Sequence, residues 1–517
     1  MIRLASYALD AWHTGAAPHA VLVNPATEEP LAETSTAGLD FGAMLAHARQ
    51  VGGPNLRALS FAQRGALLKA MSRALYSQRD RLLDIGVQNG GNSRSDAKFD
   101  VDGATATLAY YAGLGEKLGD RKVLLDGEHE QLTPKSARFF GAHALLPRRG
   151  AAVHINAFNF PAWGTFEKAA VALLAGVPVI TKPATSTAWL AYEMVKIVVD
   201  AGLLPAGALQ LVAGSPGDLL DHLDGQDVLA FTGSADTGAG LRGGRGPVSR
   251  SVRVNIEADS LNALVVGPDV GPGTTTWDWL VGAVALEMTQ KTGQKCTAIR
   301  RVIAPTEILD ELQEAIADRL DRVIVGNPSN DSVRMGPLCT ASQLRDYRSG
   351  VALLQTAARV VHGDPARVDA LDAPAGKGFY AGAVLLRADS ADCGPVHRHE
   401  VFGPVATLIP YSGDAAEAGA IVAMGGGSLA TSVCSDDRAW LSEAALEIAP
   451  YNGRILLVDE KVAEQVTPHG LVLPSVVHGG PGRAGGGEEL GGLRGLSFYL
   501  QRTGLQGNRA LLEKLLG

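Results

Sequence analysis

The stretch AAVHINAFNFPAWGTFEKAAVALLAGVPVIT (151–181) decides the fold class. It opens with the strand-like run AAVHI (151–155) and continues into a helix-like segment that starts near Thr165. It ends in VPVIT (177–181), a short apolar run typical of a buried strand. A strand, a helix and a second strand in this order are the unit of a parallel sheet covered by helices.

The same alternation continues along the chain. A helix is expected from about Thr187 to Ala201, with Gly202 as its C-terminal stop. Further strand-like runs are ALQLV (208–212), VLAFTG (228–233) and VRVNIEA (252–258). The Gly- and Pro-rich segment GPDVGPGTTT (267–276) is expected to be a hinge into a second α/β domain. Ligands of such sheets bind at the carboxyl ends of the strands.

Two segments outside this region also carry structural signals. The sequence Ser60-Phe61-Ala62-Gln63 has the form of a capping box, so a helix is expected to begin there. The late, isolated run LSFYLQRT (496–503) has β character. We expect it to form an arm that pairs with another subunit.

Length and composition indicate a globular enzyme. A chain of 517 residues is too long for one ordinary core, so two large domains and a small third element are expected. The 62 glycines suit the tight turns that α/β enzymes use around cofactors. A net charge of -8 argues against a nucleic-acid partner, which would require a basic face.

No segment predicts secretion or a membrane span. The N-terminus lacks an apolar run of signal-peptide length, and the longest apolar stretch, Ala169–Ile180, is shorter than the roughly 20 residues that cross a bilayer. The four cysteines are dispersed and form no CxxC pair, which disfavours a disulfide framework or a zinc site. A cytoplasmic enzyme with one special thiol is therefore expected.

The segment TGQKCT (292–297) places Cys296 on a glycine-containing loop after a helix-like run. Such loops hold functional groups, whereas structural cysteines usually lie within apolar runs. Neighbouring Lys295 is expected to favour the thiolate, because a free thiol with a pKa of about 8.5 needs such help to react. The alternative is that Cys296 is one of four inert thiols.

A series of segments, in the expected order, resembles the motifs of the aldehyde dehydrogenase superfamily. They are NAFNFP (156–161), ITKPA (180–184), FTGS (231–234) with Gly238 beyond it, GQKCTAIRR (293–301), MGP (335–337) and EVFGP (400–404). The resemblance covers nearly the whole chain. It implies an α/β fold with two Rossmann-type parallel-sheet domains, a small β element for oligomerisation, and oxidation of an aldehyde to an acid.

The resemblance also implies the catalytic residues. Cys296 is the nucleophile, and the Asn159 side chain with the Cys296 backbone N–H stabilises the negative oxygen that its attack creates. Glu257 falls where the family has the base that activates water for thioester hydrolysis. Without the family context, a solvated strand-end carboxylate is the stronger interpretation of Glu257. Glu489 resembles a glutamate that relays protons, against the alternative of an ordinary charge on a glycine-rich surface loop.

An NADP cofactor is expected, with NAD as the second choice. No G-x-G-x-x-G fingerprint stands in a strand–turn–helix setting. Many NAD-preferring members of the family have a glutamate three residues beyond the motif lysine, where this chain has Thr185. A carboxylate there would repel the 2′-phosphate of NADP, whereas a hydroxyl can donate a hydrogen bond to it. Thr185 can also simply cap the following helix. The expected cofactor contacts are Lys182, Thr185, Ser186, Phe158, Gly233, Ser234, Gly238, Glu400 and Phe402.

A metal site is not expected. The stretch His397-Arg398-His399-Glu400 offers two histidines and a carboxylate, but no HExxH-type helix supports a metal there.

One departure from the common family pattern narrows the substrate. The segment EADSLN (257–262) resembles the branch that comprises 3,4-dehydroadipyl-CoA semialdehyde dehydrogenases of the benzoyl-CoA epoxidation pathway and the aldehyde dehydrogenase part of phenylacetate ring-opening enzymes. This implies aromatic compound catabolism and a CoA-linked semialdehyde substrate. The alternatives are a CoA-acylating dehydrogenase, a non-catalytic family member and a reductase of acyl phosphates.

The expected domains follow from these assignments. Residues 1–128 and 149–259 form the cofactor domain, 260–470 form the catalytic domain, and 129–148 with 471–517 form the oligomerisation element and tail. We expect a homodimer or a dimer of dimers, with Cys296 in a tunnel between the two large domains.

Overall fold

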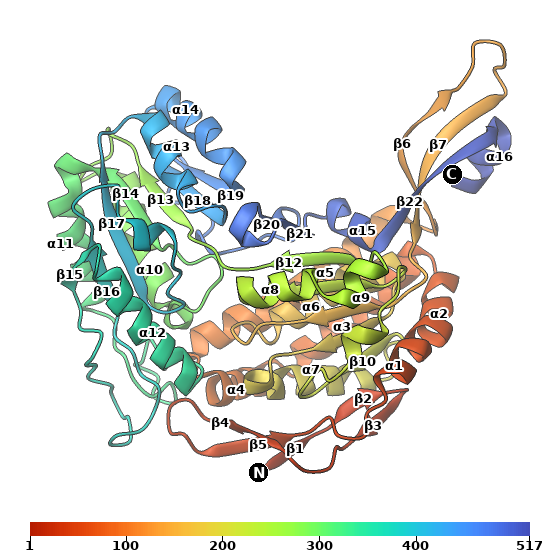
Figure 1. Ribbon diagram of the computed structural model, residues 1–517, viewed down its shortest axis with the longest axis horizontal. Helices are drawn as coiled ribbons and strands as arrows, with labels where there is room; N and C mark the ends of the chain where they lie inside the picture. Colours follow the sequence, from red (N-terminus) through yellow and green to blue (C-terminus); the bar gives the residue numbers. More distant parts are fainter. Residues whose placement is uncertain (517) are drawn as a thin grey trace.

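The structure is a computed structural model that describes residues 1–516. It consists of two α/β lobes, a small sheet along one side, and an arm that projects from one lobe (Figure 1). The side sheet contains β1 (Ile2–Leu4), β5 (Pro30–Thr34) and β4 (Ala20–Val23). Among the described residues, no helix combines the length and the apolar character that crossing a bilayer requires.

The first lobe is built on a seven-stranded sheet. In order across the sheet the strands are β12 (Arg253–Glu257), β11 (Val228–Thr232), β8 (Ala152–Ile155), β9 (Val179–Lys182), β10 (Leu209–Leu211), β2 (Ser6–Ala8) and β3 (Ala11–His13). The strands from β12 to β10 are parallel, and β2 and β3 extend the sheet in antiparallel fashion. The predicted parallel sheet is therefore confirmed.

Helices cover both faces of this sheet, and their bounds agree with the sequence patterns. The main ones are α3 (Phe61–Ser77), α4 (Arg79–Gly90), α5 (Arg94–Leu118), α6 (Trp163–Ala175), α7 (Ala188–Asp200) and α8 (Ala235–Arg242). The capping box of Ser60 and Gln63 is present at the start of α3. The largest hydrophobic cluster joins α3, α5 and α6 to the sheet.

The second lobe repeats this architecture. Its sheet has the order β15 (Arg359–His362), β16 (Val384–Arg387), β17 (Val405–Tyr411), β14 (Arg301–Pro305), β13 (Ala263–Val266), β18 (Ser428–Cys434) and β19 (Asn452–Val458). All neighbours are parallel except β15. The covering helices are α10 (Thr275–Thr289), α11 (Leu309–Leu320), α12 (Ala341–Leu354), α13 (Ala415–Ala423) and α14 (Arg438–Ile448).

The expected hinge at 267–276 is wrong. This segment connects β13 to α10, and both belong to the second lobe. The chain instead passes between the lobes at 258–262, between β12 and β13. A Gly- and Pro-rich segment indicates a turn, whether the turn lies within a lobe or between lobes. Composition alone could therefore not separate the two possibilities for 267–276.

The arm contains β6 (Leu124–Gln131), β7 (Phe139–Pro147) and β22 (Leu500–Asn508), with α16 (Arg509–Leu516) at its end (Figure 1). The β character expected for 496–503 is wrong in its first half, because Leu493–Tyr499 form the helix α15. Leu496 and Tyr499 lie three residues apart and bury one helical face in the core. From Leu500 onward the chain is a strand that pairs with β7.

A hairpin within the predicted tail lies beside the lobes rather than in the arm. It consists of β20 (Val477–Gly480) and β21 (Gly487–Leu490), which are antiparallel. His478 on β20 is directly opposite Glu489 on β21, and the hairpin lies between β12 and β19 (Figure 1). Facing residues of an antiparallel pair present their side chains on one side, so the hairpin brings both groups to the same region.

The first turn of α6 depends on a residue from another helix. Its own N-cap position, Ala162, provides no side-chain cap. Asp100 of α5 is fully buried and accepts hydrogen bonds from the backbone N–H groups of Ala162 and Trp163, at 3.3 and 2.7 Å. This contact fixes the start of α6 and with it the turn that carries Asn159.

Replacement of Asp100 by alanine is expected to lower the free energy of unfolding by about 1–3 kcal/mol, because two buried N–H groups lose their acceptor. Urea unfolding followed by circular dichroism measures the loss. Asp100→Asn retains one acceptor oxygen and is expected to fall between the wild type and the alanine variant. Equal stability of all three proteins would contradict this role.

Candidate active site

The loop before Cys296 has an unusual backbone. After α10, Lys291, Thr292 and Gly293 all have positive φ values, of 53°, 57° and 66°. The left-handed conformation costs a non-glycine residue roughly 1–2 kcal/mol. Two such residues in succession therefore need strong tertiary contacts to hold them.

Two other sequence motifs provide these contacts. The Thr292 hydroxyl donates to the Gly336 carbonyl at 2.9 Å. Gly293 lies so close to the Gly403 carbonyl that a Cβ at this position would collide with it. The segments MGP (335–337) and EVFGP (400–404) thus hold the loop that leads to Cys296.

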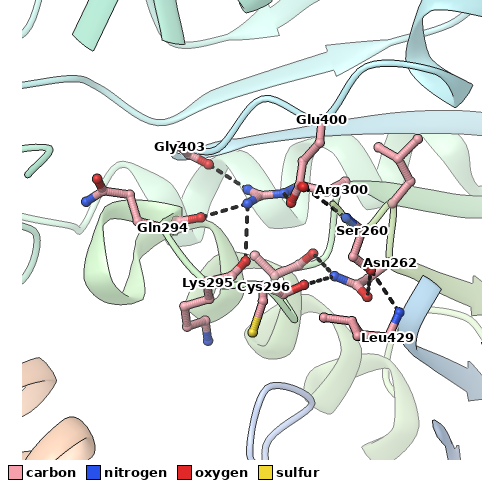
Figure 2. A network of polar contacts seen from close by, with 12 residues as sticks. Ser260, Asn262, Gln294, Lys295, Cys296, Arg300, Glu400, Gly403 and Leu429 are labelled. Carbon is pink, nitrogen blue, oxygen red and sulfur yellow. Dashed lines mark hydrogen bonds and ion pairs between the residues drawn. The ribbon is translucent and has the colours of Figure 1, made fainter. Parts of the chain in front are cut away.

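A buried polar network holds the backbone of the loop that carries Cys296 (Figure 2). The Asn262 amide donates to the carbonyls of Cys296 and Ala298, at 2.8 and 3.0 Å. Its oxygen accepts from Ser260 Oγ at 2.6 Å. Residues of the unusual EADSLN segment therefore hold the nucleophile loop, and the Cys296 side chain points away from this network (Figure 2).

Arg300 joins this loop to Glu400. Its guanidinium donates to the carbonyls of Gly293, Lys295 and Gly403, at 2.9, 3.3 and 2.7 Å. Its Nε lies 3.3 Å from Glu400 Oε1 (Figure 2). Burial raises the pKa of Glu400 to about 7, against the opposing effect of Arg300.

The expectation that Lys295 favours the thiolate is wrong. Its side chain is fully buried and its ammonium lies 2.8 Å from Glu287 Oε1. It also donates to Gln290 Oε1 at 2.8 Å. The charge of Lys295 is therefore neutralised by Glu287 and does not act on the Cys296 thiol.

Three predicted catalytic residues line one cavity at the carboxyl ends of β8 and β12. Cys296, Asn159 and Glu257 share it with Trp163, Val472 and Gly470. The Asn159 amide donates to the Gln294 carbonyl at 3.0 Å, which fixes its orientation. An amide nitrogen has a second N–H, and this one remains available to an oxygen formed beside Cys296.

Glu257 is buried rather than solvated. Its Oε2 accepts from Thr232 at 3.4 Å and its Oε1 lies 3.0 Å from His478 Nε2. Burial by itself would raise the pKa of Glu257, but the His478 imidazolium, with Lys168 beyond it, lowers that pKa below its usual range. Burial and the Glu257 carboxylate both raise the pKa of the Cys296 thiol well above its ordinary value.

Glu489 lies in a second small cavity next to the first. Its Oε1 accepts from Asn255 at 3.0 Å and its Oε2 lies 3.2 Å from Lys168 Nζ. Glu167 and Lys168 line both cavities, so they connect Glu489 to the region of Cys296. Burial raises the pKa of Glu489, which makes this carboxyl able to hold a proton near neutral pH.

An open cleft, also lined by Cys296, lies next to the first cavity. Five of the expected cofactor residues line it: Phe158, Gly233, Ser234, Glu400 and Phe402. A Cβ on Gly233 would lie 2.5 Å from the Phe231 ring. Ser234 caps α8, whose next turn contains Gly238, so the cleft ends at a helix N-terminus, which favours a phosphate.

The remaining expected cofactor residues follow β9. Lys182 is the last residue of this strand, and within residues 1–516 no hydrogen bond or ion pair reaches its ammonium. Burial lowers its pKa. Thr185 and Ser186 are half-buried in the turn before α7, and the side chain of Thr185 caps no helix. A positive group without a partner and a free hydroxyl fit an anionic ligand.

The stretch from His397 to Glu400 has other roles than metal binding. His397 accepts from Arg301 through Nδ1 at 3.1 Å, and its Nε2 lies 2.8 Å from the Ala391 carbonyl. Glu400 is held by Arg300 and by the Ser260 N–H at 2.9 Å. The nitrogen and oxygen atoms of these side chains that could bind a metal do not converge on one point.

Sequence reasoning missed His478, Arg300 and the pair Glu167 and Lys168. His478 stands in VVHGGPG (476–482), which matches no motif. Recognition of 477–490 as a hairpin would have placed it opposite Glu489. Arg300 lies within the motif GQKCTAIRR (293–301), but nothing there indicates its contacts with Gly403 and Glu400. Glu167 and Lys168 occupy ordinary positions in a helix-like run, where nothing in the sequence distinguishes them from structural charges.

Comparison with known proteins identifies the family of this chain. The family model "Aldehyde dehydrogenase family" matches residues 12–502. The chain is 46% identical, over 93% of both sequences, to the 3,4-dehydroadipyl-CoA semialdehyde dehydrogenase of Aromatoleum evansii.

Solved structures show the same fold. The structure of 3,6-anhydro-L-galactose dehydrogenase in complex with NAP has a TM-score of 0.85 at 22% identity, over 98% of this chain and 100% of that one. PnpE in complex with nicotinamide adenine dinucleotide has a TM-score of 0.84 at 23% identity, over 98% and 97%. The predicted fold is confirmed, and the chain belongs to the aldehyde dehydrogenase family.

Proposed function

We propose that this protein uses NADP to oxidise a CoA-linked semialdehyde to the carboxylic acid, with Cys296 as the nucleophile and water as the final acceptor. The observation that carries this proposal is the cavity shared by Cys296, Asn159 and Glu257. It contains a thiol, an amide donor and a carboxylate, which are the three groups that the reaction requires.

The chain's own residues carry the covalent steps. The Cys296 sulfur attacks the aldehyde carbon, and Asn159 and the Cys296 N–H donate to the oxygen that becomes negative. A nicotinamide cofactor held in the cleft that Phe158, Glu400 and Phe402 line would supply the hydride acceptor for this carbon. Loss of the hydride leaves a thioester on Cys296. Glu257 then removes a proton from the water that attacks the thioester, and the acid leaves as the thiol is restored.

Glu489 is proposed to pass the proton from Glu257 onward. Carboxylate oxygens of Glu167, Glu257 and Glu489 lie within 4.8 Å of one another. The buried Glu489 retains a proton more readily than an exposed glutamate. The thioester is proposed to be hydrolysed rather than to pass its acyl group to free CoA. Glu257 supports this choice, because a thiol acceptor needs no such base.

The substrate class rests on the relative from Aromatoleum evansii, whose name states a CoA semialdehyde. The cavity beside Cys296 supports it in part, because a second, largely apolar groove that includes Phe99 and Leu473 continues from Trp163 and Val472 toward the surface. Such a passage accommodates an extended chain that bears the aldehyde at its inner end. A role in aromatic compound catabolism is proposed on the same ground.

The NADP preference rests on Lys182, Thr185 and Ser186. The ammonium of Lys182 lacks a partner among the described residues, and the Thr185 hydroxyl makes no cap. Both can therefore bind a 2′-phosphate.

The subunits are proposed to form a homodimer or a dimer of dimers through the arm. Strand β6 lies at one edge of the arm's sheet and, among the described residues, pairs only with β7. A free sheet edge readily pairs with another strand. The domain boundaries given above are proposed with this assignment.

The first test is reduced-nicotinamide formation with a panel of aliphatic aldehydes and a CoA-linked semialdehyde. Wild-type protein is expected to be active with NADP, and Cys296→Ala is expected to lose more than about a thousandfold in kcat. Cys434→Ala is the control, because Cys434 is buried in β18 away from the cavity. Full activity of Cys296→Ala would overturn the proposed nucleophile.

Replacement of Glu257 by glutamine separates hydride transfer from hydrolysis. Stopped-flow absorbance is expected to show a burst of reduced cofactor equal to the enzyme concentration, followed by turnover slowed by at least about a hundredfold. The burst arises because the thioester forms but no base activates water. If free CoA accelerates wild-type turnover severalfold, the acylating alternative replaces hydrolysis.

Replacement of Thr185 by glutamate is expected to reverse the cofactor preference. A carboxylate beside Lys182 repels a 2′-phosphate, so kcat/KM with NADP is expected to fall at least about tenfold while kcat/KM with NAD is kept or rises. Thr185→Gln, which has similar size and no charge, separates charge from bulk. An unchanged ratio in the glutamate variant would exclude Thr185 from the 2′-phosphate site.

A further inference from the structure

His478 is a buried histidine that touches both reacting groups of the proposed site. Its Nε2 lies 3.0 Å from Glu257 Oε1 and 3.8 Å from Cys296 Sγ. The side chain of His478 is 6% exposed and that of Glu257 is 3% exposed. The three residues come from β20, from β12 and from the loop after α10, so the fold brings them together from distant parts of the chain.

The proposed chemistry creates an electrostatic difficulty that His478 can resolve. The Glu257 carboxylate is charged before the reaction begins, because its pKa is lowered, and atoms of Glu257, Cys296 and His478 all lie within 4.8 Å of one another. Conversion of the Cys296 thiol to a thiolate therefore places a second anion close to the first. In a buried site each anion raises the pKa of the other. Burial, and after it the Glu257 carboxylate, already raise the pKa of the Cys296 thiol well above its ordinary value, and Lys295, the cation next to it in the sequence, is paired elsewhere.

The surroundings of His478 favour its protonated form. Burial opposes a charge on the ring, but the Glu257 carboxylate raises the pKa of His478 above its ordinary value. Glu489 lies directly across the hairpin from it. The charged groups that face His478 are Glu257 from β12, Glu167 and Lys168 from α6, Glu489 from β21 and Arg454 from β19.

We propose that His478 is a further catalytic residue, an imidazolium that contacts both Cys296 and Glu257 and allows thiolate and carboxylate to be charged together. The thiol releases its proton to solvent before the aldehyde arrives, and His478 keeps both of its ring protons throughout. It therefore acts through its charge and not as a base. This inference rests on the proposed function for its purpose, but the charge arrangement exists without substrate or cofactor.

The test is the rate at which iodoacetamide alkylates Cys296 as a function of pH, in the absence of aldehyde and cofactor. Only the thiolate reacts, so the midpoint of the rate profile reports thiol ionisation. In the full-length His478→Gln protein this midpoint is expected to move up by at least about one pH unit, with alkylation roughly tenfold slower at neutral pH. Peptide mass spectrometry assigns the label to Cys296.

His469→Gln is the matched control. His469 is 2% exposed and adjoins Gly470 of the same cavity, but burial lowers its pKa to about 4, so it carries no charge to lose. This variant is expected to keep the wild-type alkylation midpoint. An equal shift in both histidine variants would show a packing effect and overturn the proposal.

His478→Asn provides a second variant should His478→Gln fail to fold. Its amide also carries no charge, so the midpoint is expected to move up as in His478→Gln. No upward shift in a folded His478→Gln or His478→Asn protein overturns the role of His478. If the alkylation shifts occur but no aldehyde is oxidised, the charge arrangement stands and the proposed function fails.

Discussion

The active site depends on one strained turn. Lys291, Thr292 and Gly293 adopt three successive left-handed conformations, and this places Cys296 at the point where the two lobes meet. The strain is held by hydrogen bonds from Thr292 to Gly336 and from Arg300 to Gly293 and Gly403. Motifs far apart in the sequence therefore share one task. They keep a short loop in a conformation that it would not adopt by itself.

Two groups of buried charged side chains surround this turn. Behind it, Lys295 pairs with Glu287, and Arg300 with Glu400, so these buried charges hold the loop and neutralise one another. On the cavity side of the turn, two acidic and two basic groups are buried close together: His478 pairs with Glu257, and Lys168 pairs with Glu489. In a low-dielectric environment such a cluster responds strongly to the gain or loss of one proton. The first group holds the loop in place, and the second belongs to the chemistry.

The sequence predicted the parallel sheets, the start of α3 and the location of Cys296, because each has a local signal such as apolar periodicity, a capping box or a glycine-containing loop. It failed at 267–276, where a turn within a lobe has the same composition as a hinge, and at 496–499, where tertiary packing gives a helix. The roles of Asn159 and Glu257 came from resemblance rather than from spacing. His478 and Arg300 make contacts with distant segments, which local patterns do not predict, even for Arg300 within the motif GQKCTAIRR.

The separation of Cys296 and His478 along the chain has a consequence for the protein during its synthesis. The two residues are 182 positions apart, so a ribosome completes the cysteine, its loop and most of the second lobe before the hairpin exists. Until then the Cys296 thiol lacks its contact with His478, and Lys168 lacks its partner Glu489. The site is therefore complete only when the hairpin, one of the last parts of the chain to be made, docks between the lobes.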